Sequence, residues 1–428
     1  MTYHNAVKRL LTTPQGSDPR SAERVSLLCQ ALNVPVRGLT VVEILGESGK
    51  SACASMLSQA LLSRGYRVGT LTTPFSHTMT ECIAVNCAPV SMDTFTEHVS
   101  RTLETVSDLR AGIASASTEE YQENDTLSPI EQAVFSYANR GETFSPFADE
   151  LLLTAALSCF AESACQIAVI EIPSGDRGGA YRLPLAPAIS VITATDEIAI
   201  ATQICRTLDK RSRETVTALQ SKAVYSMISD TCAKFNCRLT MPLISAFYPA
   251  DFAANRMRFF YKNAERTLHS GAYYQALNML TVCETLEALK RQGFSADPLA
   301  ADFHPPVGNA GVELQFAFLS LHPTIITDPA DTPNRMSAFA ASLHYHSNAL
   351  GENIILVAEE SSLGNSEISE LLDRQEITVH QIVRATAENA RRTMKPIIKA
   401  LTAADTILVT GSRPFVYETA RAIGGLMS

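Results

Sequence analysis

Short runs of β-branched and aliphatic residues alternate along the chain with longer segments in which apolar residues recur every three or four positions. In the first half, the apolar runs are Leu39–Leu45, Arg67–Thr72, Gln166–Ile172 and Ala188–Thr193. Runs of this length predict buried strands, and the spacing between them predicts amphipathic helices. The alternation is typical of βαβ units and predicts a mostly parallel, doubly wound sheet.

The same alternation returns near the C-terminus, where the apolar runs are Thr324–Thr327, Asn353–Ala358 and Thr406–Thr410. These runs predict a second sheet with its own helices. Between the two regions, Tyr273–Gln292 has the periodicity of one long amphipathic helix. The fold class is therefore α/β, and we expect two domains.

The predicted boundary lies at Phe303–Gly311, which carries two prolines and two glycines and shows no periodicity. The predicted domains are residues 1–303, which are larger and doubly wound, and residues 304–428, which form a smaller Rossmann-like α/β domain. Within the first domain, Asp108–Phe147 predicts helices joined by polar connectors.

The composition fits this organisation and limits the classes of function. At about 150 residues per domain, 428 residues correspond to two or three domains. Hydrophobic residues make up 46% and charged residues 18%, against about 25% charged in an average protein, which is typical of well-buried globular domains. The formal charge is -9 without any run of like charges, so no surface is predicted for a nucleic-acid backbone or an anionic membrane.

The ten cysteines lie in largely apolar segments and include no C-x-x-C pair. This argues against a zinc cluster and against a secreted disulfide framework, so we expect reduced thiols. The first residues contain no apolar stretch of signal-peptide length, and no segment reaches about 18 consecutive apolar residues. We therefore expect a soluble cytoplasmic protein.

A glycine-rich turn, Gly46-Glu-Ser-Gly49-Lys50-Ser51, directly follows the first predicted strand and precedes a helical pattern. This order suits a phosphate, because backbone amides can approach it, Lys50 adds a positive charge and the Ser51 hydroxyl can bind magnesium. The two glycines are closer together than in G-x-x-x-x-G-K-[ST]. An ordinary βα turn with an exposed, solvated Lys50 therefore stays open.

The short G-x-x-G-K spacing resembles the phosphate loop of the Mur-type ligases, and later motifs resemble one branch of them, the folylpolyglutamate synthase/dihydrofolate synthase family. These motifs are Gly65-Tyr-Arg-Val-Gly69, Thr72-Thr-Pro-Phe75, Glu81-Cys-Ile83, Phe147-Ala-Asp-Glu150, Ala168-Val-Ile-Glu171, Tyr274-Gln275-x-x-Asn278 and Val409-Thr-Gly-Ser412. They follow the order and approximate spacing of the family. The resemblance extends from about Asn5 to Gly425.

This resemblance implies an ATP-dependent ligase that joins a carboxylate to an amine. The carboxylate of a small acid, folate-like or other, takes the γ-phosphoryl group of ATP, and an amino acid such as glutamate attacks the acyl phosphate, with ATP and Mg2+ as cofactors. By position, the resemblance implies that Lys50 holds the β- and γ-phosphates. It also implies metal ligation by Ser51 and Glu150. Asn278 and Asp328 then belong to the nucleotide site.

Several positions depart from the family pattern. Glu47 places a carboxylate beside the predicted phosphate site, which is electrostatically unfavourable. Where the family has a metal-binding histidine the chain has Asp196-Glu197, and Glu197 is the predicted replacement ligand, since a carboxylate suits magnesium. The family's catalytic lysine has no clear counterpart, and Lys210 is a displaced candidate. An arginine and a histidine that close over the nucleotide are missing.

Two functions stay open on these grounds. One is a divergent ligase that keeps the phosphate lysine and Glu150. The other is a non-catalytic or regulatory protein on the same fold, which the missing arginine, histidine and lysine favour. His344 and His346 are spaced like a metal-binding pair but adjoin a polar turn, and we expect both to be surface residues.

Overall fold

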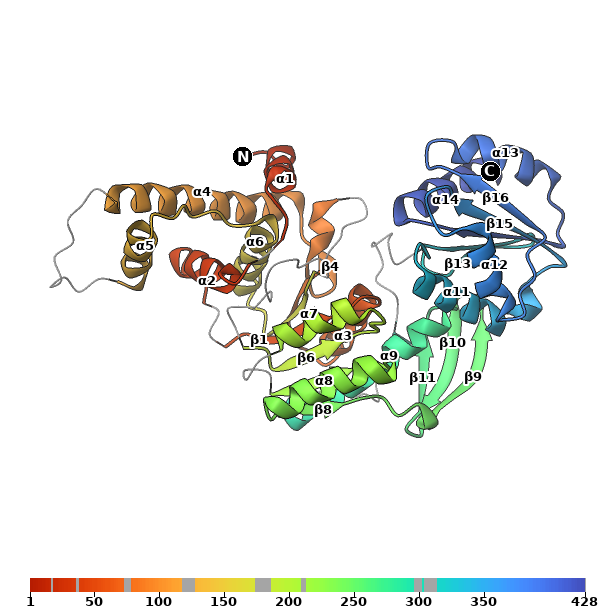
Figure 1. Cartoon of the computed structure of the whole chain (residues 1–428), viewed down its shortest axis with the longest axis horizontal. Coiled ribbons are helices and arrows are strands. Elements are labelled where there is room, and N and C mark those ends of the chain that lie inside the picture. Colours follow the sequence, from red (N-terminus) through yellow and green to blue (C-terminus); the bar gives the residue numbers. More distant parts are fainter. Residues whose placement is uncertain are drawn as a thin grey trace. The chain divides into compact units, whose positions relative to one another are not determined.

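The computed structural model describes residues 1–16, 18–35, 38–72, 78–117, 128–173, 186–208, 213–295, 302–303 and 314–427. The chain divides into two compact units, shown in Figure 1. The first unit comprises Met1–Met241 and Glu284–Ala296, and the second comprises Pro242–Cys283 and Asp297–Ser428. The single boundary predicted at residues 303/304 therefore differs from the observed division, in which the chain passes between the units three times.

The first unit contains one eight-stranded sheet with the strand order β4-β3-β2-β5-β1-β6-β7-β8. Its strands are β1 (Thr40–Leu45), β2 (Val68–Leu71), β3 (Ile83–Val85), β4 (Ala88–Pro89), β5 (Ile167–Glu171), β6 (Ile189–Ile192), β7 (Glu214–Thr217) and β8 (Arg238–Thr240). The strands β2, β5, β1, β6, β7 and β8 pair in parallel with their neighbours in this order. The β2–β3 and β3–β4 pairs are antiparallel. The predicted parallel sheet and its four predicted strands are confirmed.

Helices cover this sheet. They are α1 (Tyr3–Thr12), α2 (Ser21–Ala31), α3 (Lys50–Leu62), α4 (Met92–Ala116), α5 (Pro129–Asn139), α6 (Ala148–Glu162), α7 (Ile198–Thr207) and α8 (Lys222–Lys234). Every residue of α6 from Glu150 to Phe160 is buried, because this helix has apolar residues on all sides and lies inside the unit against α2 and α4. Figure 1 shows α4 as the longest rod of this unit.

The last part of α9 (Tyr273–Arg291) and the residues after it complete the first unit. Arg291 Nε donates to Glu214 Oε1 at 3.1 Å, and Gln292 Nε2 donates to the Ala188 carbonyl at 3.0 Å. The amide of Ser295 donates to the Tyr66 hydroxyl at 2.8 Å. These contacts bind a segment that is distant in sequence to β6, β7 and the turn before β2.

The second unit contains a five-stranded, mostly parallel sheet with the order β13-β14-β17-β15-β16. Its strands are β13 (Ala317–Leu321), β14 (Thr324–Asp328), β15 (Asn353–Glu359), β16 (Gln381–Ala385) and β17 (Asp405–Thr410), and its helices are α11 (Pro333–Tyr345), α12 (Asn365–Asp373), α13 (Ala390–Ala400) and α14 (Arg413–Met427). Alternate strand residues point to opposite faces, so Ile326 packs with α11 and α12 while Ile325 packs with α14. This confirms the second α/β domain.

A second sheet in this unit was not predicted from the sequence. It has the order β12-β11-β10-β9 and consists of β9 (Phe247–Ala253), β10 (Arg256–Tyr261), β11 (Ala264–Leu268) and β12 (Asp302–Phe303). An aromatic contact joins this sheet to a helix of the five-stranded sheet. The Phe252 ring of β9 stacks on the Tyr345 ring of α11, with the ring centroids 4.6 Å apart. These contacts explain why residues 242–283 belong to the C-terminal unit.

The two histidines that were expected at the surface differ from each other. His344 is exposed, as predicted. His346 is buried, and its Nε2 lies 2.8 Å from the Gly271 carbonyl oxygen. The surface prediction is therefore wrong for His346, because a histidine can enter a core when its ring nitrogen has a backbone partner.

All ten cysteines are free thiols, and six of them are buried. This agrees with the predicted reduced state. Among the helices of the described ranges, none combines the length and the apolar character needed to cross a membrane.

Candidate phosphate-binding site

The turn after β1 has the backbone that its glycines permit. Gly46 has φ 129° and Gly49, at the N-cap of α3, has φ 88°, and both values favour glycine. A Cβ at Gly46 would lie 2.2 Å from Thr193 Oγ1. No side chain fits there, so the predicted glycine-rich turn between a buried strand and a helix start is present.

Lys50 is the first residue of α3, and its side chain folds back over the turn. Its ammonium group lies 2.9 Å from the Gly46 carbonyl oxygen and 3.4 Å from that of Glu47. The residue is only 7% exposed. The alternative that stayed open, an exposed and solvated Lys50, is therefore wrong. The loop carbonyls supply hydrogen-bond acceptors that compensate for the lost water.

Ser51 meets a carboxylate from the neighbouring strand. Its hydroxyl donates to Glu171 Oε2 at 2.8 Å. Glu171 is the last residue of β5, lies level with Ile44 of β1, and is buried. In P-loop nucleotide-binding proteins a loop serine or threonine and an acidic residue from a separate motif hold magnesium together. Ser51 and Glu171 place two oxygens side by side at this glycine-rich turn.

The other side of the turn is acidic and closed. The amides of Glu47 and Ser48 donate to the Ala194 carbonyl at 3.3 and 3.1 Å. The Glu47 carboxylate accepts the Asp196 amide at 3.2 Å. Burial and then the neighbouring Glu47 raise the pKa of Asp196. Because two loop amides already have an acceptor, a phosphate that used them would have to displace the Ala194 carbonyl.

Glu150 lies in a different environment from the one predicted. Arg24 of α2 donates to both of its oxygens, through Nε at 2.7 Å and Nη2 at 2.6 Å, and the Phe147 amide donates to Oε2 at 3.2 Å. Glu150 is fully buried. Its carboxylate caps α6 and neutralises Arg24, and this geometry favours a structural role over metal binding.

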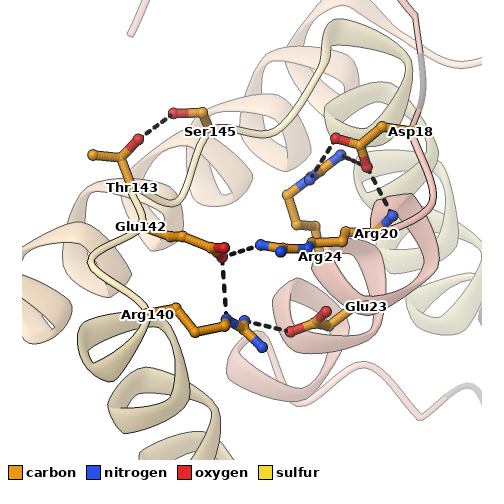
Figure 2. A network of polar contacts seen from close by, with 8 residues as sticks. All are labelled: Asp18, Arg20, Glu23, Arg24, Arg140, Glu142, Thr143 and Ser145. Atoms are coloured by element: carbon orange, nitrogen blue, oxygen red, sulfur yellow. Dashed lines mark hydrogen bonds and ion pairs between the residues drawn. The ribbon is translucent and has the colours of Figure 1, made fainter. Parts of the chain in front are cut away.

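Arg24 also binds Asp18, and Figure 2 shows this pair next to a surface chain of ion pairs. Burial works against the charged form, but the hydrogen bonds to Glu150 and Asp18 raise the pKa of Arg24. The surface chain joins α2 to the residues that follow α5. It consists of Arg20, Glu142, Arg140 and Glu23.

The predicted second metal ligand is Glu197. Glu197 is exposed at the N-cap of α7. In the ranges that the structure describes, no three His, Cys, Asp or Glu side chains are grouped to hold a metal ion. Lys210, the predicted catalytic lysine, lies outside the described residues.

The two predicted nucleotide residues of the second unit are buried. Asp328, the last residue of β14, accepts a hydrogen bond from the Tyr274 hydroxyl at 2.8 Å, and burial raises its pKa to about 7. Asn278 donates to Gln275 Oε1 at 3.0 Å, and Gln275 donates to Gln315 Oε1 at 2.8 Å. Asp328 and Asn278 therefore lie in hydrogen-bonded surroundings within this unit.

Solved structures of known proteins share the fold of this chain. No family model matches the chain. Its backbone superposes on the folylpolyglutamate synthetase of Lactobacillus casei with a TM-score of 0.71 and 17% identity, over 99% of both chains. An FPGS complex with AMPPCP and folate gives 0.73 at 17% identity. The Mycobacterium tuberculosis folylpolyglutamate synthase, complexed with ADP and AMPPCP, gives 0.70 at 15% identity, over 99% of this chain and 98% of that one. The chain has the folylpolyglutamate synthetase fold.

Sequence comparison gives matches of limited extent. The dihydrofolate synthase/folylpolyglutamate synthase of M. tuberculosis is 27% identical over 178 residues, which are 41% of this chain and 31% of that protein. The dihydrofolate synthetase of Saccharomyces cerevisiae is 31% identical over 72 residues, 17% of each protein. The matches thus span less than a third of these relatives' own lengths. They agree with the resemblance found in the motifs.

Glu171 is a candidate site residue that the sequence alone did not single out. The motif Ala168-Val-Ile-Glu171 was noted, but the acid was taken as part of a strand. The available signal was its position, because an acid at the carboxyl end of a buried parallel strand lies at the edge where ligands bind. Pairing of β5 with β1 brings it to Ser51.

A second turn of similar design follows β17. Gly411 has φ 152°, and the next residue, Ser412, donates its amide to Glu359 Oε2 at 2.7 Å and its hydroxyl to Oε1 at 3.0 Å. Glu359 is the last residue of β15, which pairs with β17. The start of α14 thus binds a carboxylate of its own chain.

Proposed function

We propose that the chain binds Mg-ATP at Gly46–Ser51 and is a divergent ATP-dependent carboxylate–amine ligase of the folylpolyglutamate synthase kind. One observation carries this proposal. Lys50 and the Ser51–Glu171 pair meet at a glycine-rich turn between a buried strand and a helix start. A cation and metal-binding oxygens at this point are what a nucleoside triphosphate needs. Relatives with this fold carry AMPPCP or ADP in their structures.

The residues fit a magnesium ion. Ser51 and Glu171 already converge within hydrogen-bond distance, and both offer oxygen, the donor that Mg2+ prefers. Mg2+ is commonly held by one or two protein oxygens together with phosphates and water, so this pair is sufficient. When bound, the ion neutralises phosphate charge. Glu171 replaces Glu150 in this proposal, because the oxygens of Glu150 bind Arg24.

In the proposed reaction Lys50 changes partners. Its ammonium group now bonds the Gly46 carbonyl, and we expect it to turn to the β- and γ-phosphates when ATP enters. A substrate carboxylate displaces ADP from the γ-phosphorus and becomes an acyl phosphate, and an amine then attacks its carbonyl carbon and releases phosphate. We propose a folate-like acid and glutamate as substrates. Lys210 and Glu197 remain predicted participants.

A specific observation favours the alternative, a non-catalytic protein on the same fold. The Glu47 and Ser48 amides are bonded to the Ala194 carbonyl, and the Glu47 carboxylate lies on the side where phosphates would bind. Both features oppose an anion. In this alternative the turn is held closed and the chain binds nucleotide weakly or not at all.

Calorimetry with Mg-AMPPCP, followed by ADP release in the presence of ATP, a folate and glutamate, tests the proposal. Binding together with ADP release that requires both the acid and glutamate supports the ligase. Binding without turnover, for any acid tested, supports the non-catalytic alternative. Failure to bind at millimolar nucleotide overturns the phosphate-loop assignment itself.

A further inference from the structure

Helix α8 ends in a turn that brings two cysteines together. The amide of Cys237 donates to the Cys232 carbonyl at 2.8 Å, and the amide of Asn236 donates to the Ala233 carbonyl at 3.1 Å. Asn236 has φ 54°. These two bonds and the left-handed residue define a Schellman motif, in which side chains at the positions of Cys232 and Cys237 contact each other.

The two thiols differ in their surroundings and in their exposure. The turn places the Cys232 and Cys237 side chains next to each other. The Cys237 sulfur also lies 3.2 Å from Thr215 Oγ1 on β7. Cys232 is buried, whereas Cys237 is half-buried. The pair therefore has an inner thiol and an outer thiol that solutes can reach.

The outer thiol is the more acidic one. The neighbouring Cys232 thiol lowers the pKa of Cys237 against the effect of burial, and the Thr215 hydroxyl adds to the lowering. Glu214 and the negative end of α8 act in the opposite direction. Glu214 is paired with Arg291 and lies 3.6 Å from Arg238, which reduces its effect. Cys165 and Cys87, the half-buried thiols without such a donor, have pKa values raised by burial to about 11.

We propose that Cys232 and Cys237 form a thiol modification site that reacts with small disulfides such as glutathione disulfide. The Cys237 thiolate attacks one sulfur of the reagent, and the first glutathione leaves as its thiolate. Cys232 then gives up its proton and attacks the Cys237 sulfur, which releases the second glutathione. Two protein thiols are oxidised to one disulfide, and one glutathione disulfide is reduced to two glutathiones. The reaction is independent of the proposed ligase function.

Trypsin offers a direct readout, because it cuts after Lys222, Lys234 and Arg238 and so separates the two cysteines. The full chain is incubated with glutathione disulfide, its free thiols are blocked, and the digest is analysed by mass spectrometry. The expected product is the peptide 223–234 joined to 235–238 by a disulfide, with the buried Cys53 and Cys82 still reduced. If both peptides carry only the blocking group, the proposal is overturned.

Variants separate the two steps. In Cys232→Ser the reaction should stop at a glutathione adduct on Cys237, and in Cys237→Ser both the adduct and the link should be lost. Cys205→Ser is the matched control, since Cys205 lies nearby but bonds Thr231, and it should leave the link unchanged. A link between Cys205 and Cys232 in the parent chain would contradict the assignment.

Alkylation tests the acidity without any variant. At neutral pH, Cys237 should react with iodoacetamide at least about tenfold faster than Cys165, because the fraction of each thiol present as thiolate governs the rate. Equal rates for the two half-buried thiols would overturn the role of Cys237 as the attacking group.

Discussion

The turn after β1 and the turn after β17 are built alike but hold different partners. In each, a glycine with a left-handed φ follows a buried parallel strand, a serine lies at the start of a helix, and the neighbouring strand ends in a glutamate. In the second unit Glu359 accepts both the amide and the hydroxyl of Ser412. In the first unit Glu171 accepts the Ser51 hydroxyl, and Lys50 lies across the turn.

This difference shows how one backbone design can serve structure or ligand binding. A helix N-terminus favours negative charge, and a carboxylate from the chain can supply it permanently. The start of α14 is neutralised in this way by Glu359. At the start of α3 the chain supplies the Lys50 ammonium as well as the Glu171 carboxylate, and in the proposed site this cation pairs with the phosphates of a ligand. Lys50 therefore distinguishes a proposed phosphate site from an internal cap.

The largest effect is expected for Lys50→Ala. Removing the cation should weaken Mg-AMPPCP binding by about two to three orders of magnitude, the usual loss when a charged donor leaves an enclosed anion site. Calorimetry measures it, with the exposed Lys222→Ala as a control that should bind normally. Because Lys50 is buried and bonded to Gly46, its loss should also lower the melting temperature by a few degrees. Unchanged affinity would remove the distinction between the two turns.

Exchanging the glutamates should produce opposite results in the two turns. Glu359→Gln should destabilise the second unit by about 2 kcal/mol, since two donors of Ser412 lose a charged acceptor. Native-state hydrogen exchange of β17 measures this loss, and nucleotide affinity should stay the same. Glu171→Gln should abolish the magnesium dependence of nucleotide binding and leave β17 unaffected. If both variants behave alike, the comparison between the turns fails.

A smaller effect distinguishes Asp328 from these glutamates. Burial raises its pKa from 3.8 to about 7 in the folded chain, so the folded state binds more protons between these values. Stability should therefore fall as pH rises, by about 1.4 kcal/mol between pH 6 and pH 8 for this group alone. Asp328→Asn should remove that part of the slope in urea melts. An identical slope in the variant would contradict the assigned protonation.

The serines should give the smallest effects. Ser412→Ala removes one of the two donors that bind Glu359 and should lower the stability of the second unit by about 1 kcal/mol, measured by hydrogen exchange of β17. Ser51→Ala should leave β17 unchanged and weaken magnesium-dependent nucleotide binding by about tenfold. A loss of stability in the second unit on changing Ser51 would show that the effect is not local.

Much of the fold could be predicted from periodicity, because buried parallel strands are continuous apolar runs. Thr40–Leu45 and Asp405–Thr410 were found in this way within one residue at each end. The sheet β9–β12 was missed, since its strands alternate apolar and charged residues, as in Arg256–Tyr261, and pair across short turns. The domain boundary was placed by a local break in the sequence, which cannot show which segments pack together.

The site was only half predictable for a similar reason. The glycine turn is contiguous in sequence, so Lys50 and Ser51 could be proposed from it alone. Glu171 reaches the turn through strand pairing, and Arg24 reaches Glu150 through packing of α2 on α6, and neither contact leaves a local pattern. The resemblance to a family predicts Glu150 as a metal ligand, and in the structure its two oxygens bind Arg24.

The tail of α9 has a consequence for synthesis on the ribosome. Its contacts with Glu214, Ala188 and Tyr66 belong to the first unit, yet the residues that make them follow a whole segment of the second. All eight strands of the first sheet lie before residue 241 and can pair early, but the unit cannot be completed until residue 295 has left the exit tunnel. Each nascent chain must hold an unfinished N-terminal unit while residues 242–283 emerge. During that interval we expect chaperones to bind the surface that this segment later covers, next to Glu214, Ala188 and Tyr66.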